Sequence, residues 1–492
     1  MTLAFRTEYH MAAMGSPAPD RMSQVIPRIT VMTPDQISQV HAWSLKILAT
    51  VGVRVDSPQA RTLLTGAAGV PLKDDCVRIP PELVEWALSA APADVAVFDR
   101  SGRPAFNVGP GAGTRFGIGV TNLYYQDPLT DAVVPFTREH MARSTRLGDA
   151  LPSFDCISTI GVLRDLPPDV ADLYATLEMA ANTTKPLVLL VSAAATFEPA
   201  LDLLEALCGT LSAKPFVIPY FNPISPLVIN ADTSDKMSAT IARGLPFIYS
   251  NYGMSGATAP ITPAGTLALL NAELLAGLVL AQLLHEGAPV ILGSLPAGFD
   301  MKSAASYYGP ETMLLNLACG EMMAHYRLPH CGTSGSGAGW GADLPAADLF
   351  WINHLTSCLG EAGLEPFVGG NFDSLVFSPA AIVYADHIIR EVRRFAGGFV
   401  LDDAELGLPE IAEVGPGGDF LMAGLTLKNF RRAAFDSPVF PRLSLEAWQA
   451  AGGPRAEDIL RRQTVALMES HPAPPDRADL LERGEALIRR SG

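Results

Sequence analysis

The chain has 492 residues, 48% hydrophobic and 17% charged, so it can bury a large core and is neither disordered nor fibrous. Thirty-five Lys and Arg against 51 Asp and Glu give a formal net charge of -16, which disfavours nucleic-acid binding. The six cysteines form no CxxC pair, and the N-terminus lacks a long apolar run behind basic residues. These features predict a reduced, cytoplasmic protein.

The first 112 residues divide into two parts. Residues 1–30 are rich in Met, Pro and Ser with little periodicity, which predicts a flexible arm. From Thr33 the pattern becomes helical, because Thr33 can cap a helix that has Pro34 at its first position. Short strands and further helices follow, so residues 31–112 are expected to form a small N-terminal α+β cap.

Between residues 113 and 400, apolar runs of strand length alternate with segments of helical periodicity. The runs are continuously apolar, as in strands that are buried on both faces. Eight runs are found, at 116–121, 154–161, 186–192, 215–222, 246–252, 289–294, 329–334 and 367–373. Eight strand–helix units predict an α/β fold, a closed TIM (β/α)8 barrel over residues 113–400, with an open doubly wound sheet as the alternative.

One segment is almost long and apolar enough to span a bilayer. Asn271, Glu273 and Gln282 interrupt residues 265–284. Because unpaired polar groups are costly in hydrocarbon, we interpret this segment as a buried barrel helix and expect no membrane association.

The chain after the barrel becomes more polar. Residues 379–396 predict a helix, and VGPGGDFLM at 414–422 predicts a glycine turn before another apolar segment. From Pro438 onward the sequence is polar and helical. Residues 401–492 are therefore expected to form a C-terminal helical extension packed on the outside of the barrel.

Several predicted strands end in small polar or aromatic residues, and barrel active sites lie at the carboxyl ends of strands. Asn222, Asn251 and Asn371 are examples. Aromatic residues occur at the same places, and ring faces suit a quaternary ammonium ion, which has no N–H to donate. Turn capping for the polar residues and ordinary core packing for the rings remain the alternatives.

The sequence lacks GxGxxG opening a helix, GxxxxGK[ST], HExxH and GxSxG. Its nine histidines are dispersed, so no metal site is predicted. A glycine-rich loop, GTSGSGAGWGAD at 332–343, directly follows a predicted strand but lacks the lysine of a P-loop. We interpret it as a loop whose bare backbone contacts a large flat ligand, with a phosphate cradle as the alternative.

Five strings resemble the trimethylamine methyltransferase family. They are LYYQDPLTDAVVPFT (123–137), TIGVLRDLPPD (159–169), TAPITPAGTLALLNAELLAGLVLAQLLHEGAPVILGS (258–294), DMKSAASYYGPETMLLNLACGEMMAHYRLPHCGTSG (300–335) and VGPGGDFL (414–421). The similarity runs in order along nearly the whole chain, and GVRVDSPQA and VRIPPELVEWAL in the cap also fit. Because the sequence has no pyrrolysine, it is most similar to the branch that includes glycine betaine:corrinoid methyltransferases.

The resemblance implies an enzyme that transfers a methyl group from a quaternary or tertiary methylated amine to the Co(I) form of a corrinoid (cobalamin). A small corrinoid-binding partner protein would carry this cofactor and dock over the barrel mouth, so this chain is expected to bind no cofactor tightly. A homo-oligomer is compatible with the expectation. Because a quaternary amine already has a neutral leaving group, an aromatic, desolvated pocket needs no general acid or base, and no catalytic residue is assigned.

Within this resemblance, the expected substrate-binding residues fall into two groups. Five rings are expected to hold the cation: Phe221, Tyr252, Trp340, Phe372 and Phe377. Five polar residues are expected to orient a carboxylate or hydroxyl group of the substrate and the corrinoid face: Asn222, Asn251, Ser336, Asn371 and Asp373. The glycines expected to face the corrinoid are Gly335, Gly337 and Gly339.

The chain also departs from the family pattern. Relatives commonly have a loop like GTAGxSDxKxxDxQ, where Ala338 and Trp340 here replace a typical Asp and Lys, while Asp343 keeps the second acidic position. Leu425-Thr426 replaces a usual HT pair. These departures favour a bulkier or different methylated substrate. They also keep two other functions open, a non-catalytic binder of betaine-like compounds and a barrel enzyme of unrelated chemistry with a phosphate-binding glycine loop.

Overall fold

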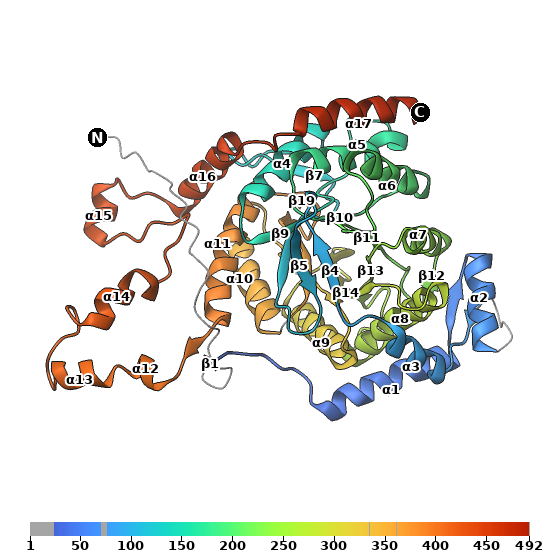
Figure 1. Cartoon of the computed structure of the whole chain (residues 1–492), viewed down its shortest axis with the longest axis horizontal. Coiled ribbons are helices and arrows are strands. Elements are labelled where there is room, and N and C mark those ends of the chain that lie inside the picture. The colour runs from blue at the N-terminus through green and yellow to red at the C-terminus, as the bar shows by residue number, and fades with distance from the viewer. Residues whose placement is uncertain (1–23, 70–75, 334, 361, 492) are drawn as a thin grey trace. The chain divides into compact units, whose positions relative to one another are not determined.

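The computed structural model describes residues 24–69, 76–333, 335–360 and 362–491 (Figure 1). Residues 1–23 of the arm expected at 1–30 lie outside this described part. The chain divides into two compact units. We call residues 28–393 with 436–492 the barrel unit, and residues 1–27 with 394–435 the second unit.

The N-terminal cap begins as the sequence predicts. Helix α1 (Pro34–Thr50) is capped by the Thr33 hydroxyl, which accepts the Gln36 N–H, while the Gln36 side chain accepts the Thr33 N–H. Strand β2 (Val53–Val55) pairs antiparallel with β3 (Cys76–Val77) and parallel with β12 (Val228–Ile229). Helices α2 (Pro58–Ala68) and α3 (Pro81–Ala90) pack with α1 against a barrel helix, α8 (Pro263–Leu284).

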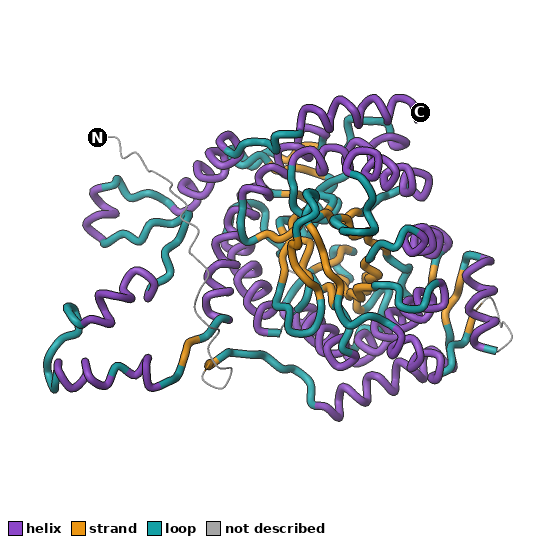
Figure 2. The backbone as a smooth tube through the Cα atoms, in the orientation of Figure 1, coloured by secondary structure: helices purple, strands orange, loops and turns teal. Residues whose placement is uncertain are grey.

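Eight parallel strands form the centre of the barrel unit, and helices surround them (Figure 2). The strands are β6 (Arg115–Ile118), β9 (Phe154–Ser158), β10 (Leu187–Leu189), β11 (Val217–Phe221), β13 (Phe247–Ser255), β14 (Val290–Asp300), β16 (His330–Cys331) and β17 (Leu364–Val368). Each pairs in parallel with the next in chain order, and β17 pairs with β6 to close the ring. The predicted TIM barrel is confirmed, and the open sheet is excluded.

The eighth strand starts earlier than predicted. Its expected range was 367–373, whereas β17 spans Leu364–Val368. Glu365 and Pro366 interrupt the apolar run in the sequence, but the Glu365 side chain is completely buried. Residues after Val368 instead form β18 (Gly370–Asn371), which turns back to pair with β19 (Val376–Phe377).

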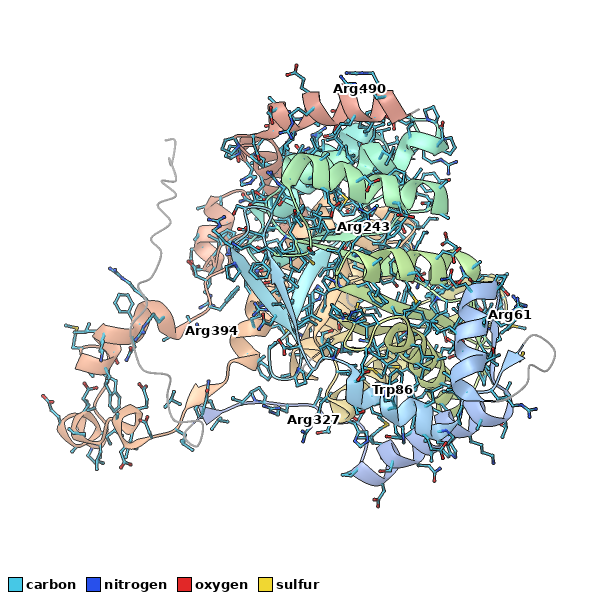
Figure 3. All side chains as sticks on the ribbon, turned by 45° about the vertical axis from the view of Figure 1, so that its right-hand side comes forward. Arg61, Trp86, Arg243, Arg327, Arg394 and Arg490 are labelled. Carbon is cyan, nitrogen blue, oxygen red and sulfur yellow. The ribbon has the colours of Figure 1, made fainter. Side chains whose placement is uncertain are left out.

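The helices around the barrel follow the predicted alternation. They are α4 (Arg138–Ala150), α5 (Pro168–Asn182), α6 (Ala194–Cys208), α7 (Ala231–Ala242), α8, α9 (Pro310–Tyr326), α10 (Leu344–Leu359) and α11 (Pro379–Ala396). Helix α8 has the length and hydropathy of a membrane span, but 89% of its most apolar window is buried inside the protein, as predicted for a barrel helix. Arg243, which follows α7, forms ion pairs with three carboxylates of α6 (Figure 3).

A β-hairpin closes the amino-terminal end of the barrel. Strands β4 (Val95–Phe98) and β5 (Pro104–Val108) pair antiparallel. Their side chains Val97 and Phe106 share one buried cluster with inward-facing strand residues such as Ile218 and Leu364. The opposite, carboxyl end therefore forms the accessible mouth, where barrel chemistry is found.

Additional short strands lie around this mouth. Strands β7 (Tyr124–Gln126) and β8 (Val133–Pro135) form a hairpin after β6, and β7 also pairs with β19. The resulting four-stranded sheet has the order β18-β19-β7-β8. Strand β15 (Ala305–Tyr307) pairs antiparallel with the end of β14.

The expected C-terminal extension, 401–492, belongs to both units. Helices α15 (Leu445–Ala450), α16 (Ala456–Ser470) and α17 (Arg477–Ser491) belong to the barrel unit, where α16 contacts α4 and α17 contacts α5 and α6. Residues 401–435 belong to the second unit. There β1 (Gln24–Val25) pairs with β20 (Phe399–Val400), followed by α12 (Asp403–Leu406), α13 (Leu408–Val414) and α14 (Gly424–Ala433).

Candidate functional site

A pocket of about 360 Å³ opens at the carboxyl ends of the barrel strands. It lies beside the ends of β10 and β11 and the first turn of α7, and its volume suits a small ligand. Its lining residues are Thr121, Leu123, Val162, Leu190, Val191, Ser192, Tyr220, Phe221, Asn222, Asp232, Thr233 and Lys236. We call this the mouth pocket.

Lys236 gives the mouth pocket a fixed positive charge. The ammonium group forms an ion pair with Asp232 (2.8 Å) and donates to the Val191 carbonyl (3.0 Å). Its side chain is only 8% exposed, whereas that of Asp232 is 39% exposed. A lysine held this way, with one of three N–H donors left for a ligand, is suited to bind an anionic group.

Tyr220 and Asn222 form the barrel side of the same pocket. The Tyr220 ring stacks edge to face on Phe367 (5.1 Å between centroids), and its hydroxyl accepts a hydrogen bond from the Asn222 amide (3.1 Å). Asn222 also donates to the Ser250 carbonyl (2.8 Å). Burial raises the pKa of Tyr220, so the hydroxyl stays neutral over the physiological range.

A second polar group forms around Tyr252, Tyr308 and Asp373. The Tyr308 N–H donates to the Asp373 carboxylate (3.4 Å). Burial raises the pKa of the Tyr308 hydroxyl, and the Tyr252 hydroxyl and Asp373 raise it further. Burial also raises the pKa of Asp373, against the opposing effect of the Tyr308 N–H. Two tyrosine hydroxyls and a carboxyl group therefore lie within reach of one another.

The chain holds Asp373 in a strained conformation. Phe372, Asp373 and Ser374 have φ values of 49°, 51° and 76°, three successive left-handed residues none of which is glycine. Backbone hydrogen bonds compensate, because the Phe372 and Asp373 N–H groups donate to Gly339 and Gly337 (2.9 Å each). The Ser374 hydroxyl donates to Ser336 (2.6 Å).

The backbone of residues 335–339, in the glycine-rich loop, forms hydrogen bonds with the backbone that follows β17. The Gly337 N–H donates to the Gly370 carbonyl, and the Gly369 N–H donates to Gly335. A Cβ atom at Gly335, Gly337 or Gly339 would lie 2.5–2.9 Å from Val368, Leu349 or Ala346, respectively. The glycines thus permit close packing against α10 and β17. Because the Gly337 N–H is already used, it is not free to bind phosphate.

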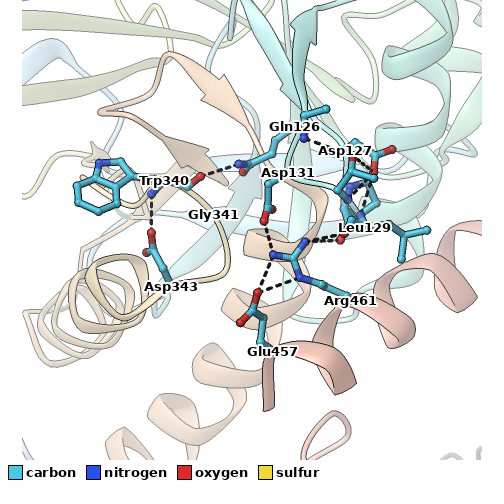
Figure 4. A network of polar contacts seen from close by, with 12 residues as sticks. Gln126, Asp127, Leu129, Asp131, Trp340, Gly341, Asp343, Glu457 and Arg461 are labelled. Atoms are coloured by element: carbon cyan, nitrogen blue, oxygen red, sulfur yellow. Dashed lines mark hydrogen bonds and ion pairs between the residues drawn. The ribbon is translucent and has the colours of Figure 1, made fainter. Parts of the chain in front are cut away.

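Trp340 belongs to a polar network that links the hairpin β7–β8 to α16 (Figure 4), and Asn371 joins it through Gln126. The Gln126 amide donates to the Trp340 carbonyl (2.6 Å), and the Asn371 amide donates to Gln126 (3.0 Å). Asp343 caps α10 by accepting the Ala346 N–H (3.0 Å), and it also accepts the Trp340 N–H (2.8 Å).

The same network continues to the C-terminal helices. Arg461 forms ion pairs with Asp131 in the hairpin and with Glu457, and it donates to the carbonyls of Pro128 and Leu129 (Figure 4). The Trp340 ring is 67% exposed and lines a separate groove next to these residues. The family's second acidic position, Asp343, therefore serves as a helix cap in this chain.

Two expected substrate contacts face away from the mouth, and a third has its main ring contacts in the outer layer. The Asn251 amide donates to Glu273 (3.0 Å) and to the Leu270 carbonyl, on the helix side of β13. Phe377 is completely buried against Phe136. Phe221 lines the pocket but stacks on Phe197 and Phe247 in the outer layer.

The five expected rings do not form one cage. Among the described residues, no ring contact joins any two of Phe221, Tyr252, Trp340, Phe372 and Phe377. Phe372 is 39% exposed in the loop after β17. Of the expected residues, Phe221 and Asn222 line the mouth pocket, and Tyr252 and Asp373 form the neighbouring polar group.

Sequence reasoning missed Lys236 and Tyr308. Lys236 stands four residues after Asp232 in a helix, which is the usual pattern of a surface ion pair. Tyr308 stands in a Tyr-Tyr-Gly-Pro turn with no carboxylate or basic residue directly beside it in sequence. The only available signal was position, because Lys236 lies in the first half of α7 and Tyr308 directly precedes α9, two helices that follow barrel strands.

Two buried titratable groups lie outside the mouth. Burial raises the pKa of Glu365 to about 8, and it lowers the pKa of His330 to about 4. Both surround Gly332, where a Cβ atom would lie 2.6 Å from the Glu365 carboxyl oxygen. Within the described ranges, no group of three or more His, Cys, Asp or Glu side chains could hold a metal ion.

The chain is similar in sequence to methyltransferases of methylated amines along nearly its whole length. The family model described as trimethylamine methyltransferase (MTTB) matches residues 5–491. The trimethylamine methyltransferase MttB of Desulfitobacterium hafniense is 28% identical over 454 residues, 90% of each chain. A glycine betaine methyltransferase of D. hafniense (strain Y51) is 26% identical and covers 87% of this chain and 90% of its own. In fold alone, the chain resembles the Methanosarcina barkeri monomethylamine methyltransferase MtmB, with a TM-score of 0.51, 10% identity and coverage of 89% and 98%.

Proposed function

This chain belongs to the trimethylamine methyltransferase family, and from that premise we propose that it transfers a methyl group from a betaine-like quaternary amine to the Co(I) corrinoid of a partner protein. The observation that carries the proposal is the mouth pocket, where the Lys236 ammonium and the Tyr220 ring line one small cavity. Named relatives act on trimethylamine and on glycine betaine. The chemistry of this pocket favours the second kind of substrate.

A betaine carries a carboxylate and a permanently positive trimethylammonium group, and the mouth pocket offers a partner for each. Lys236, fixed by Asp232, would bind the carboxylate. The Tyr220 ring, with Tyr252 nearby in the same buried cluster, would face the trimethylammonium group. Trimethylamine has no carboxylate, so Lys236 would add nothing to its binding.

The remaining residues position the substrate without proton transfer. The C–N bond breaks with its electron pair left on nitrogen, so a quaternary donor leaves as a neutral amine and needs no general acid. Tyr220 and Tyr252 would exclude water from the methyl group, and Asn222 fixes the Tyr220 hydroxyl. The Co(I) corrinoid supplies the electron pair that forms the new bond to the methyl carbon.

The rim of the mouth fits a large apolar acceptor. Leu123 both lines the pocket and is 37% exposed, and Tyr124 beside it is 38% exposed. Leu129, Val133 and Val134 on the same hairpin are also exposed. Exposed apolar side chains that adjoin a pocket mark an interaction surface. These residues would contact the corrinoid and its partner protein.

Free Co(I) cobalamin and a panel of methylated amines test the proposal. Purified protein with glycine betaine should cause loss of Co(I) absorbance, and trimethylamine should react more slowly. Lys236→Met should raise KM for the betaine about 10- to 100-fold, the effect of losing a charged hydrogen bond. It should leave the reaction with trimethylamine unchanged. Lys214→Met, at an exposed lysine, is the matched control.

Two results would contradict the proposal. Equal loss of activity toward both amines in Lys236→Met would show that Lys236 does not bind the carboxylate. Thermal stabilisation by a betaine without loss of Co(I) absorbance would indicate a binding protein that does not transfer methyl groups.

A further inference from the structure

Two arginines of the barrel unit donate to the same neutral oxygen. Asn182, the last residue of α5, is completely buried. Its amide oxygen accepts hydrogen bonds from Arg146 of α4 (3.2 Å) and from Arg477 at the start of α17 (2.9 Å). In the part of the chain that the structure describes, neither guanidinium group forms an ion pair. Two positive charges therefore meet without a carboxylate between them.

The carboxylates of the same helices and their ends bind other groups. Three of them form ion pairs with other arginines: Glu178 with Arg138 (2.7 Å), Asp476 with Arg100 (2.5 Å) and Asp479 with Arg483 (2.9 Å). Asp149 contacts His471 (2.9 Å) and accepts the Thr183 hydroxyl (2.5 Å). None of these four carboxylates contacts Arg146 or Arg477, so the charge of the pair stays uncompensated.

This arrangement has an electrostatic cost. Burial lowers the pKa of Arg146, and the charges of Arg477 and Arg143 lower it further. The Glu178 carboxylate acts in the opposite direction. Each guanidinium group has five N–H donors, of which one binds Asn182, and both arginines are partly exposed to solvent. A bound anion would remove the repulsion and would use the remaining donors of both groups.

We propose that Arg146 and Arg477 together bind a phosphate-type oxyanion, either free phosphate or the phosphoryl group of a small metabolite. A planar guanidinium group binds such an oxyanion through two parallel hydrogen bonds. Two guanidinium groups match the charge of a phosphoryl group, which is about -1.5 to -2 at pH 7. A monocarboxylate carries only half of this charge. A nucleic acid is disfavoured, because carboxylates flank the pair and the whole chain has a net charge of -16.

The anion site would be separate from the mouth. Asn182 ends the helix that leads into β10, so the pair lies toward the amino end of this strand, whereas the mouth pocket lies at the carboxyl ends. A methylated amine is a cation, which two arginines would repel. The anion would instead connect α4, α5 and α17, and so hold the C-terminal helix on the barrel. The inference does not depend on the proposed function.

Calorimetric titration of the full chain with inorganic phosphate, at constant ionic strength, tests the proposal. The wild type should bind one phosphate per chain, and it should bind acetate at least about 10-fold more weakly. Arg146→Met and Arg477→Met should each lower the affinity about 10- to 100-fold, the effect of losing a charged hydrogen bond. Arg483→Met is the control, because Arg483 lies on the same helix but pairs with Asp479, and it should bind phosphate as the wild type does.

The source of the phosphoryl group is distinguished by a second titration, with glycerol 3-phosphate. Tighter binding of this ester than of phosphate would identify a phosphorylated metabolite as the ligand, and the reverse order would identify free phosphate. No saturable binding of either compound would overturn the proposal. Binding of phosphate that neither Arg146→Met nor Arg477→Met weakens would also overturn it.

Chemical modification gives a further readout that needs no variant. Phenylglyoxal reacts with accessible arginines, and phosphate should slow its reaction with Arg146 and Arg477 but not with Arg483, as measured by mass spectrometry of peptides. Equal modification with and without phosphate would contradict the proposal. If the two methionine variants lose the same thermal stability in phosphate as in chloride, the arginines only connect the helices and the proposal is wrong.

Discussion

Replacing Glu273 by glutamine should change how the stability of the protein depends on pH. Glu273 lies on α8 and is 2% exposed. Its carboxylate accepts the Ser225 hydroxyl (2.8 Å), the Leu227 N–H (2.7 Å) and the Asn251 amide (3.0 Å). None of these donors carries a charge. Burial therefore dominates and raises the pKa of Glu273 to about 7.

The size of the effect follows from this pKa. A carboxyl group whose pKa rises from 4.5 to about 7 holds its proton about 3 kcal/mol more tightly in the folded state than in the unfolded chain. Below pH 4.5 both states are protonated and the group's contribution is fully present. As pH rises toward and through 7, the unfolded state loses the proton first, and the folded protein loses up to about 3 kcal/mol of stability.

The variant Glu273→Gln cannot ionise. At pH 5 it should be less stable than the wild type by about 1 kcal/mol, because the amide has only one acceptor oxygen and places N–H donors against existing donors. At pH 8 the wild type carries a buried charge and the variant does not. The difference should therefore shift by about 2–3 kcal/mol in favour of the variant between pH 5 and pH 8.

Urea unfolding followed by circular dichroism at pH 5, 6, 7 and 8, at constant ionic strength, measures the free energy of unfolding of both proteins. Glu286→Gln, at an exposed glutamate just after α8, is the control and should show no such shift. If the free-energy difference between Glu273→Gln and the wild type is the same at pH 5 and pH 8, Glu273 does not titrate as its burial implies, and the reasoning is refuted.

Three other substitutions follow from the packing and from the polar network. Gly277→Ala should destabilise α8 by about 1–3 kcal/mol or more, since a Cβ atom there would lie 2.1 Å from the Tyr249 ring. The same change at Gly66, a helix position with nothing within 4 Å, should instead stabilise by about 0.5–1 kcal/mol, and thermal melting of the pair would test the opposite signs. Arg461→Met should free the hairpin that Asp131 anchors, so hydrogen exchange of residues 123–135 should become faster. Unchanged exchange would show that Arg461 does not hold the hairpin.

The sequence by itself determined the elements and their order. Continuous apolar runs indicated the eight strands, because parallel barrel strands are buried on both faces and leave no polar alternation. Thr33 and Pro34 located the start of α1. The strings shared with the trimethylamine methyltransferase family identified that family, and the family model confirmed it.

The same apolar runs could not show which side chains face into the barrel. Asn222 and Asn251 both end a predicted strand, yet Asn222 lines the mouth pocket and Asn251 donates to Glu273 on the helix side. The direction of a side chain depends on the register and tilt of the strand, and a run that is apolar on both faces carries no sign of either.

Burial of charge was likewise decided only by the tertiary structure. In sequence, Lys236 forms an ordinary ion-pair pattern with Asp232, and Glu365 interrupts an apolar run. Packing of α7 against β11, together with the hydrogen bond to the Val191 carbonyl, makes Lys236 a buried cation at the mouth. Glu365 lies against Asn316 and Ser357 and is completely buried. Burial is a property of all the elements that meet at a point, so no local pattern of residues can specify it.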